Sequence, residues 1–141
     1  MFKVLYVISI SVLLTACAVP PGNSSYDKLS DLSFKAVNSL AESTSTFLKS
    51  KSEPEALTTA QESLKQTLKD PSSAQFRNVR LEVYGSRQVI CGEINAKNSY
   101  GGYVGFKRFV ASPYQSLYEF TSSDKLANDR SNVAMKIACK F

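Results

Sequence analysis

The chain has 141 residues, and its 17 Lys and Arg against 12 Asp and Glu give a formal net charge of +5. Hydrophobic residues make up 43% of the sequence, too many for a disordered tail, and the several long apolar runs of a polytopic membrane protein are missing. Histidine is absent, which excludes His-based triads and His metal sites, and three cysteines are too few for a four-thiolate zinc site. We therefore expect one small domain with no metal and no other cofactor.

The first residues have the order of an export signal. A positive charge at Lys3 precedes an uncharged apolar run from Val4 to Leu14, and the small pair Thr15-Ala16 follows. As a helix this run would span about 16 Å, roughly half of a hydrocarbon core of about 30 Å, so we do not expect a permanent membrane span. Residues 1–16 are predicted to be a signal peptide that is removed.

The predicted cleavage site has a specific motif. Leu14-Thr15-Ala16-Cys17 resembles the lipobox of bacterial lipoproteins, in which the cysteine is acylated and the chain is cut just before it. The resemblance implies that Cys17 carries lipid, and several acyl chains together make attachment to a membrane essentially permanent. Because Ala18 rather than Asp follows, it also implies the outer membrane, facing the periplasm, in an enterobacterial host. The alternative is an ordinary signal peptide with a cysteine near its end.

After a tether at residues 17–25, two helices are predicted. Apolar residues recur every three or four positions from Tyr26 to Ser50, and a second such pattern runs from Glu53 to Asp70, where Pro71 ends it. The expected buried residues are Leu29, Leu32, Phe34, Val37, Leu40, Ala41, Phe47 and Leu48 in the first helix and Leu57, Ala60, Leu64 and Leu68 in the second.

The pattern then changes to alternation. Val79, Leu81 and Val83 alternate with polar or larger side chains at Arg80, Glu82 and Tyr84, which predicts a strand with one buried face. The further expected elements are a turn at Gly85-Ser86-Arg87, strands at Val89–Ala96, Tyr103–Ala111 and Ser116–Phe120, and a loop at Lys97–Gly102.

A closing helix completes the predicted fold. Ser123-Asp124 is expected to cap it. Its predicted buried stripe consists of Leu126, Arg130, Val133, Ile137 and Phe141, with Ala134 beside them. The fold class is therefore α+β: a helical segment at 26–70, then a module at 71–141 with an antiparallel sheet of about four strands and one C-terminal helix.

If Cys17 carries lipid, Cys91 and Cys139 are the remaining pair, and a disulfide between them is expected in an exported chain. Closing a loop of about 49 residues would stabilise the fold by about 4 kcal/mol on the chain-entropy model. A reactive redox dithiol is the alternative, but such pairs are usually close in sequence, as in Cys-x-x-Cys.

Positive charge and aromatic residues gather in the sheet module. Residues 76–141 hold ten Lys and Arg against five Asp and Glu, whereas residues 18–75 hold six against seven. Glycines and tyrosines fill the segment 100–106, and with its basic flanks it suits a glycan, an acidic protein loop or a lipid headgroup. The residues expected to bind the partner are Tyr100, Tyr103, Phe106, Lys107 and Arg108.

Two other interpretations of this segment exist. The glycines could only shape a tight hairpin while the aromatic residues alternate into the core. A basic surface with exposed aromatic rings also suits single-stranded nucleic acid, which we disfavour because lipidated envelope proteins seldom meet it.

The segments Lys69–Arg80 and Cys91–Phe106, the latter reading CGEINAKNSYGGYVGF, resemble a family of small, uncharacterised bacterial and phage proteins. The resemblance brings no activity with it. It implies that Cys91–Phe106 is a module found both in exported proteins and in mobile elements.

Catalysis is only weakly indicated. Glu82, Glu93 and Glu119 lie on predicted neighbouring strands, and paired carboxylates can hydrolyse glycosides. Alternation places Glu82 outward and Glu93 inward, where a buried carboxylate needs a partner such as Arg77 or Lys107.

A catalytic serine is also weakly indicated. Ser122 and Lys125 have the spacing of a Ser-x-x-Lys pair, but they lie at a predicted helix start, where a capping role accounts for the serine, and no Gly-x-Ser-x-Gly elbow occurs. We therefore expect a non-catalytic envelope lipoprotein, held in the membrane by its N-terminal lipid, that binds an envelope protein or glycan through a basic aromatic surface of the sheet. Its specific form would be an accessory or exclusion lipoprotein of a phage or plasmid. The alternatives are a structural subunit of an envelope or secretion assembly and a cell-wall hydrolase or hydrolase inhibitor.

Overall fold

The computed structural model describes residues 24–119 and 125–140. None of the helices in this described part combines the length and the hydropathy that a membrane crossing requires. The following predictions lie outside the described residues: the signal peptide, the lipidation site Cys17, most of the tether, Phe120, the cap at Ser123-Asp124, and Phe141.

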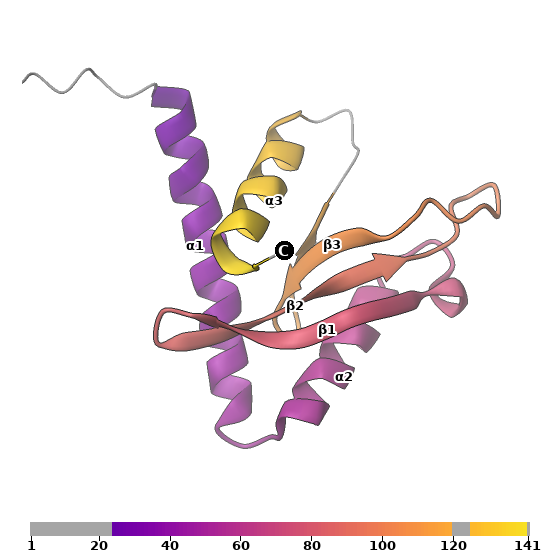
Figure 1. Cartoon of the computed structure of the whole chain (residues 1–141), viewed down its shortest axis with the longest axis horizontal. Helices are drawn as coiled ribbons and strands as arrows, with labels where there is room; N and C mark the ends of the chain where they lie inside the picture. The colour runs from indigo at the N-terminus through magenta and orange to yellow at the C-terminus, as the bar shows by residue number, and fades with distance from the viewer. Residues whose placement is uncertain (1–23, 120–124, 141) are drawn as a thin grey trace, which may run out of the picture.

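The chain has the predicted α+β fold (Figure 1). Two helices, α1 (Ser24–Leu48) and α2 (Glu53–Lys65), precede a four-stranded antiparallel sheet, and α3 (Lys125–Ala138) follows it. A short 3-10 turn, η1 (Pro71–Ser73), leads into the sheet. The strands lie side by side in their sequence order and are β1 (Gln75–Tyr84), β2 (Arg87–Asn95), β3 (Lys107–Ala111) and β4 (Ser116–Tyr118).

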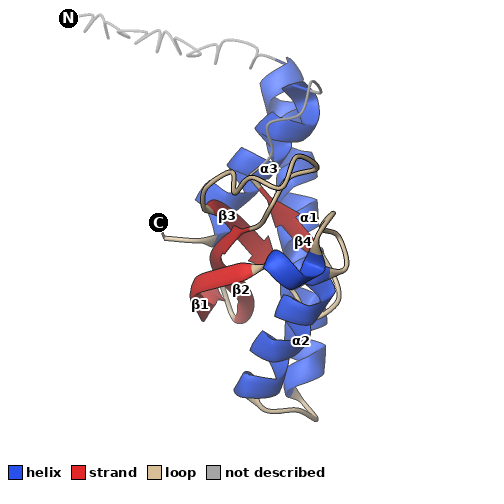
Figure 2. Ribbon diagram, turned by 90° about the vertical axis from the view of Figure 1, so that its right-hand side faces the viewer, coloured by secondary structure: helices blue, strands red, loops and turns tan. Residues whose placement is uncertain are grey.

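Helices cover both faces of the sheet (Figures 1 and 2). On one face, α1 and α3 enclose a first core that includes Val89 and Cys91 of β2. On the other face, α2 packs over a second core that includes Ile90 and Ile94 of the same strand. Because alternate residues of β2 enter different cores, this central strand is hydrophobic on both of its faces.

Helix α2 begins with favourable local chemistry. The backbone N–H of Ser52 donates to Glu55 Oε2 at 3.0 Å, and Pro54 lies in the first turn, where the predicted helix start places it. Its buried residues are Ala56, Ala60 and Leu64, which lie four apart and face the sheet. Small side chains at this contact let the helix approach the strands closely.

Strand β1 does not have the single buried face that its alternation predicts. Val83 is largely exposed, whereas Tyr84 lies against the first core and packs edge-to-face on Phe34, with 6.1 Å between the ring centroids. Phe34 itself is 51% exposed, so its predicted burial in the first helix is wrong. Glu82 faces the same side as Tyr84, and its side chain is only 15% exposed. For an outward Glu82 we expect either solvation or pairing with a basic side chain, and the structure shows pairing with Arg80 at 3.2 Å. This face is nevertheless partly covered, because helices lie on both faces of the sheet.

Several element boundaries also differ from those predicted. The structure begins α1 at Ser24 instead of Tyr26, ends α2 at Lys65 instead of Asp70, begins β1 at Gln75 instead of Val79, and begins β3 at Lys107 instead of Tyr103. The late start of β3 has a local cause, since Gly105 has a φ of 90°, which strand residues do not adopt. An irregularity between Arg77 and Arg80, with Asn78 at a φ of 54°, bends the early part of β1.

Helix α3 packs by a stripe that overlaps the predicted one only in part. Ala134 is buried as predicted, Val133 and Ile137 are half-buried, and Arg130 is exposed. Met135 and Ala138, which the prediction did not include, are buried against α1 and the sheet. The fully buried hydroxyl of Ser33 in α1 donates to the backbone carbonyl of Arg130 at 3.1 Å. Small residues on both helices therefore bring α1 and α3 into close contact, which apolar periodicity alone does not reveal.

Cys91 of β2 and Cys139, directly after α3, are joined by a disulfide, which is the pairing that the sequence predicts. Both residues are buried in the first core, with their Cα atoms 5.9 Å apart. The bridge spans 48 positions of sequence and fixes the C-terminal helix to the central strand.

We expect loss of this disulfide to lower the free energy of unfolding by about 2–4 kcal/mol, because it removes a long-loop constraint on the unfolded chain. Denaturant unfolding of the oxidised chain and of the chain refolded under reductant measures the difference. The variant carrying both Cys91→Ala and Cys139→Ala is the control and should not respond to reductant. Equal unfolding midpoints for the oxidised and reduced wild-type chains would contradict a stabilising role.

Candidate functional site

The aromatic residues of the predicted binding segment lie on a loop that extends beyond the end of the sheet (Figure 1). We call residues 97–106, which connect β2 and β3, the aromatic loop. Tyr100 is 96% exposed and Tyr103 is 47% exposed. The alternative in which these rings alternate into the core is therefore wrong for both tyrosines.

Asn98 gives the tip of the aromatic loop a defined shape. Its side-chain Oδ1 accepts hydrogen bonds from the backbone N–H groups of Tyr100 at 2.9 Å and Gly102 at 3.1 Å. Its own backbone N–H donates to the carbonyl of Gly102, and its carbonyl accepts from Gly101, which has a φ of 81°. An Asn with glycines three and four residues later is compatible with such a turn, but sequence reasoning did not single out Asn98.

The N-terminal end of the aromatic loop is fixed to η1. The backbone N–H of Lys97 donates to Ser73 Oγ at 2.9 Å, and this buried hydroxyl donates in turn to the carbonyl of Asp70 at 2.8 Å. Lys97 also pairs with Tyr103 in an isolated antiparallel bridge, and its Nζ lies 5.7 Å from the centroid of that ring. The two ends of the loop tip are therefore held together.

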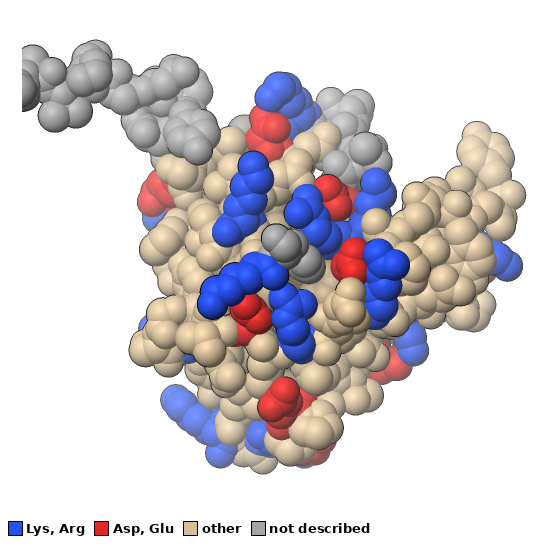
Figure 3. Space-filling view, in the orientation of Figure 1, with Lys and Arg blue, Asp and Glu red and all other residues tan. Residues whose placement is uncertain are grey.

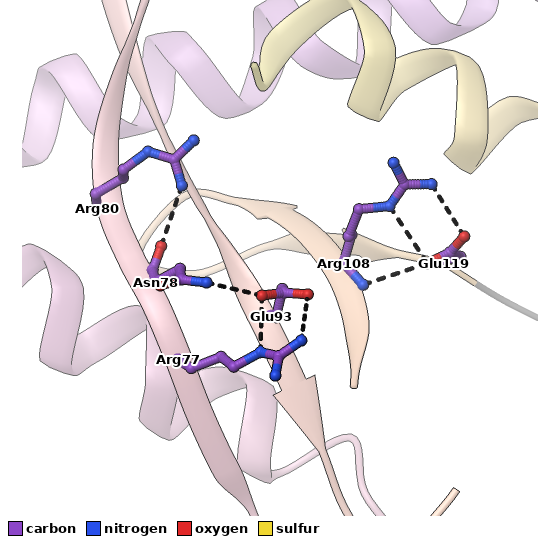
Figure 4. Close-up of polar contacts among 6 residues, drawn as sticks. All are labelled: Arg77, Asn78, Arg80, Glu93, Arg108 and Glu119. Atoms are coloured by element: carbon purple, nitrogen blue, oxygen red, sulfur yellow. Dashed lines mark hydrogen bonds and ion pairs between the residues drawn. The ribbon is translucent and has the colours of Figure 1, made fainter. Parts of the chain in front are cut away.

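The C-terminal end of the aromatic loop rests on an ion pair (Figure 4). The guanidinium carbon of Arg77 lies 3.9 Å from the ring centroid of Phe106. Arg77 also makes a bidentate pair with Glu93, from Nε to Oε2 at 2.8 Å and from Nη2 to Oε1 at 3.0 Å. Asn78 Nδ2 donates to Glu93 as well, at 2.9 Å. Of the two partners predicted for Glu93, the structure uses Arg77.

Lys107 and Arg108 lie on opposite faces of the sheet, because they are consecutive residues of β3. Arg108 Nη2 donates to Glu119 Oε1 at 3.0 Å, so this arginine is held by a neighbouring strand (Figure 4). The five residues predicted to bind a partner therefore do not form one continuous patch.

The face that carries Arg108 holds three ion pairs between arginine and glutamate. Arg80 pairs with Glu82 and donates to the carbonyl of Lys140 at 3.1 Å. Together with the pairs already described, these contacts intersperse acidic and basic side chains over the face that shows the end of α3 (Figure 3). The three arginines of these pairs are therefore held by carboxylates and are not available to an acidic partner.

The carboxylates of this face do not have the property that glycoside hydrolysis needs. Hydrogen bonds from Arg77 lower the pKa of Glu93, and hydrogen bonds from Arg108 lower the pKa of Glu119. A general acid in a glycosidase requires a raised pKa, so that it is protonated near neutral pH. The geometry thus gives no support to a hydrolytic role for either residue.

A hollow of about 320 Å³ lies on the opposite face, between the C-terminal end of α2 and the base of the aromatic loop. We call it the lysine hollow. The apolar part of its lining consists of Leu68, Ile94, Ala96, Val104 and Tyr118. Ile94 and Ala96 are buried, and Leu68 and Tyr118 pack against the second core, so these four form a floor.

Three lysines surround this floor: Lys69, Lys97 and Lys107. Among the described residues, no carboxylate lies within ion-pairing distance of their amino groups. Glu119 also lines the hollow, but its carboxylate is held by Arg108. Sequence reasoning missed Lys69, because only the packing of α2 on the sheet brings it near Lys107, and no local pattern marks that contact.

Comparisons of the chain with protein-family models, with curated proteins and with solved structures found no match. The resemblances to the lipobox and to the bacterial and phage family therefore stay predictions.

We expect the substitution Arg77→Ala to raise the pKa of Glu93 toward its ordinary value of 4.5, since the hydrogen bonds from Arg77 are the main cause of its lowering. In the wild-type chain, the stability that this pair contributes is present above about pH 4.5 and is lost as the pH falls through the lowered pKa. In the variant, that loss on acidification should be smaller.

An NMR titration of the Glu93 carboxyl, together with unfolding at several pH values, measures both effects. Arg87→Ala is the matched control, because it removes an arginine paired with Glu42 on an exposed part of the surface. An unchanged pKa of Glu93 in Arg77→Ala would show that the ion pair is not formed in solution.

Proposed function

We propose that the protein is a non-catalytic, lipid-anchored protein of the bacterial envelope whose aromatic loop captures another envelope component. The observation that carries this proposal is the exposure of Tyr100 and Tyr103 on a loop whose shape is fixed by its own hydrogen bonds.

Exposed aromatic rings on an ordered loop favour binding for an energetic reason. Tyrosine supplies a large apolar area with a polar tip, and it is enriched among residues that dominate binding energy. Because Asn98, Ser73 and Arg77 already order the loop, a partner does not have to supply the free energy for ordering it. The fold itself gains little from a ring that is 96% exposed, as Tyr100 is.

The envelope location is supported by two independent features of the chain. The first is the sequence of residues 1–17, with its apolar run and its lipobox-like end. The second is the buried disulfide, because such bonds persist in oxidising compartments. A lipid at Cys17 would hold the domain at a membrane and raise its effective concentration toward partners fixed there.

The charge distribution favours an acidic partner. Lys97 lies on the aromatic loop and Lys107 follows it, and neither forms an ion pair among the described residues. Such lysines attract an acidic protein loop or glycan during encounter and repel basic partners. The resemblance to bacterial and phage proteins adds a more specific proposal: the protein is encoded by a mobile element and binds this partner as an accessory or exclusion lipoprotein.

We expect mass spectrometry of the purified mature chain to find an acylated Cys17 at its N-terminus. The substitution Cys17→Ser should leave the chain without lipid and move it from the membrane fraction to the soluble fraction after cell lysis. A native chain with an unmodified thiol at this position would contradict the anchor.

We expect the double substitution Tyr100→Ala and Tyr103→Ala to reduce partner capture at least tenfold while the melting temperature stays nearly unchanged, since neither ring is buried. Crosslinking in intact membranes followed by mass spectrometry measures capture. Tyr114→Ala is the matched control, because Tyr114 is 66% exposed at the opposite end of β3. Equal capture by the double variant and the control would contradict a binding role for the loop.

A further inference from the structure

We propose that the lysine hollow is a binding site for a single-chain amphiphile with an anionic head, such as a fatty carboxylate or the phosphate of a lysolipid. The hollow lies beside the aromatic loop, but it uses different side chains from the two tyrosines. The proposal therefore goes beyond the capture function and does not depend on it.

The size and lining of the hollow suit a small apolar ligand. Its volume of about 320 Å³ lies at the lower end of the range for small-molecule sites, roughly 300–1,000 Å³. Its floor continues the second core, because Ile94, Leu68 and Tyr118 belong to that core or pack on it. A hydrocarbon chain on this floor would remove both its own apolar surface and that of the floor from water. This burial is favourable and requires no rearrangement of the core.

The positive charge of the lysines around the hollow favours a ligand with an anionic head group. Three lysines, Lys69, Lys97 and Lys107, line the hollow, and among the described residues none of them forms an ion pair with a carboxylate. The amino group of Lys97 also lies 5.7 Å from the ring centroid of Tyr103. The acid that lines the hollow, Glu119, is neutralised by Arg108. An anionic head would gain charge-assisted hydrogen bonds from the lysines, whereas a cationic head would be repelled.

The polar groups of the lining argue against a peptide as the occupant. The hydroxyl of Thr67 donates to the carbonyl of Leu64 at 2.7 Å, and the side-chain oxygen of Asn98 already accepts two backbone N–H groups. A peptide backbone on this floor would leave its own N–H and C=O groups without partners, at a substantial cost in free energy. A hydrocarbon chain has no such groups.

The proposal is tested by measuring the binding of short-chain amphiphiles to the full mature chain in phosphatidylcholine nanodiscs. Empty nanodiscs give the amount of each probe that the lipid alone takes up. Equilibrium dialysis compares octyl phosphate, octanoate, octanol and inorganic phosphate. We expect at least one of the two anionic amphiphiles to bind at least about tenfold more tightly than octanol and than inorganic phosphate. The stronger of the two identifies the head as phosphate or carboxylate. The proposal would be overturned if octanol or inorganic phosphate bound as tightly as the better of the two anionic amphiphiles. It would also be overturned if an acidic hexapeptide displaced that amphiphile as effectively as the unlabelled amphiphile does.

Variants locate the binding in the hollow. Val104→Asp places a carboxylate at an exposed part of the lining, and Lys107→Gln removes one of the three charges. Each should weaken the tighter amphiphile about tenfold. The matched control Lys136→Gln removes an exposed lysine on α3 and should leave binding unchanged.

Circular dichroism verifies the fold of each variant, and Val104→Asp, at a side chain that is 55% exposed, serves as the test if Lys107→Gln does not fold. Unchanged amphiphile binding in folded Val104→Asp overturns the site. The single variant Tyr100→Ala removes a ring that is 96% exposed and does not line the hollow, so it should bind the probes as the wild type does, and failure of the hollow and failure of the loop are distinguishable.

Discussion

The fold depends on the burial of β2 on both of its faces. Val89 and Cys91 enter the core under α1 and α3, while Ile90 and Ile94 enter the core under α2. Gly92 is required in the middle of this strand, because a Cβ there would lie only 2.7 Å from Cζ of the buried Phe109 ring. With both faces covered, the binding features lie at the end of the sheet, where β2 leaves the two cores and the aromatic loop begins.

Strand alternation at that end separates two kinds of surface. Residues 93 and 108 project to the α1–α3 face, where arginines pair with glutamates, and residues 94 and 107 project to the α2 face, where the lysine hollow lies. The aromatic loop stands between these surfaces and is attached to both sides, through Arg77 and through Ser73. A one-residue shift in the register of β3 would therefore exchange the faces of Arg108, which is held by Glu119, and Lys107, which lines the hollow.

Much of this fold could be predicted from the sequence, because element type and order follow from periodicity and from the residues that end helices and strands. The disulfide could be predicted because Cys91 and Cys139 have no other partner once Cys17 is assigned to lipid. The double-sided burial of β1 and β2 could not, since alternation does not show how many helical layers surround a sheet. The lysine hollow is lined both by Lys69 and by residues far along the chain, and the order of the loop tip depends on the side chain of Asn98.

The chemistry of the two basic side chains explains why the arginines and lysines of this protein have different roles. Within the described residues, four arginines pair with carboxylates: Arg77, Arg80, Arg87 and Arg108. The planar guanidinium favours such fixed geometry, which in the Arg77 pair is bidentate. An ammonium group is a compact charge on a flexible stem, and it retains its hydration until a ligand replaces the water. The arginines around the sheet therefore pair with its acidic residues, whereas the lysines beside the aromatic loop, Lys69, Lys97 and Lys107, form no ion pair among the described residues and can meet an acidic ligand.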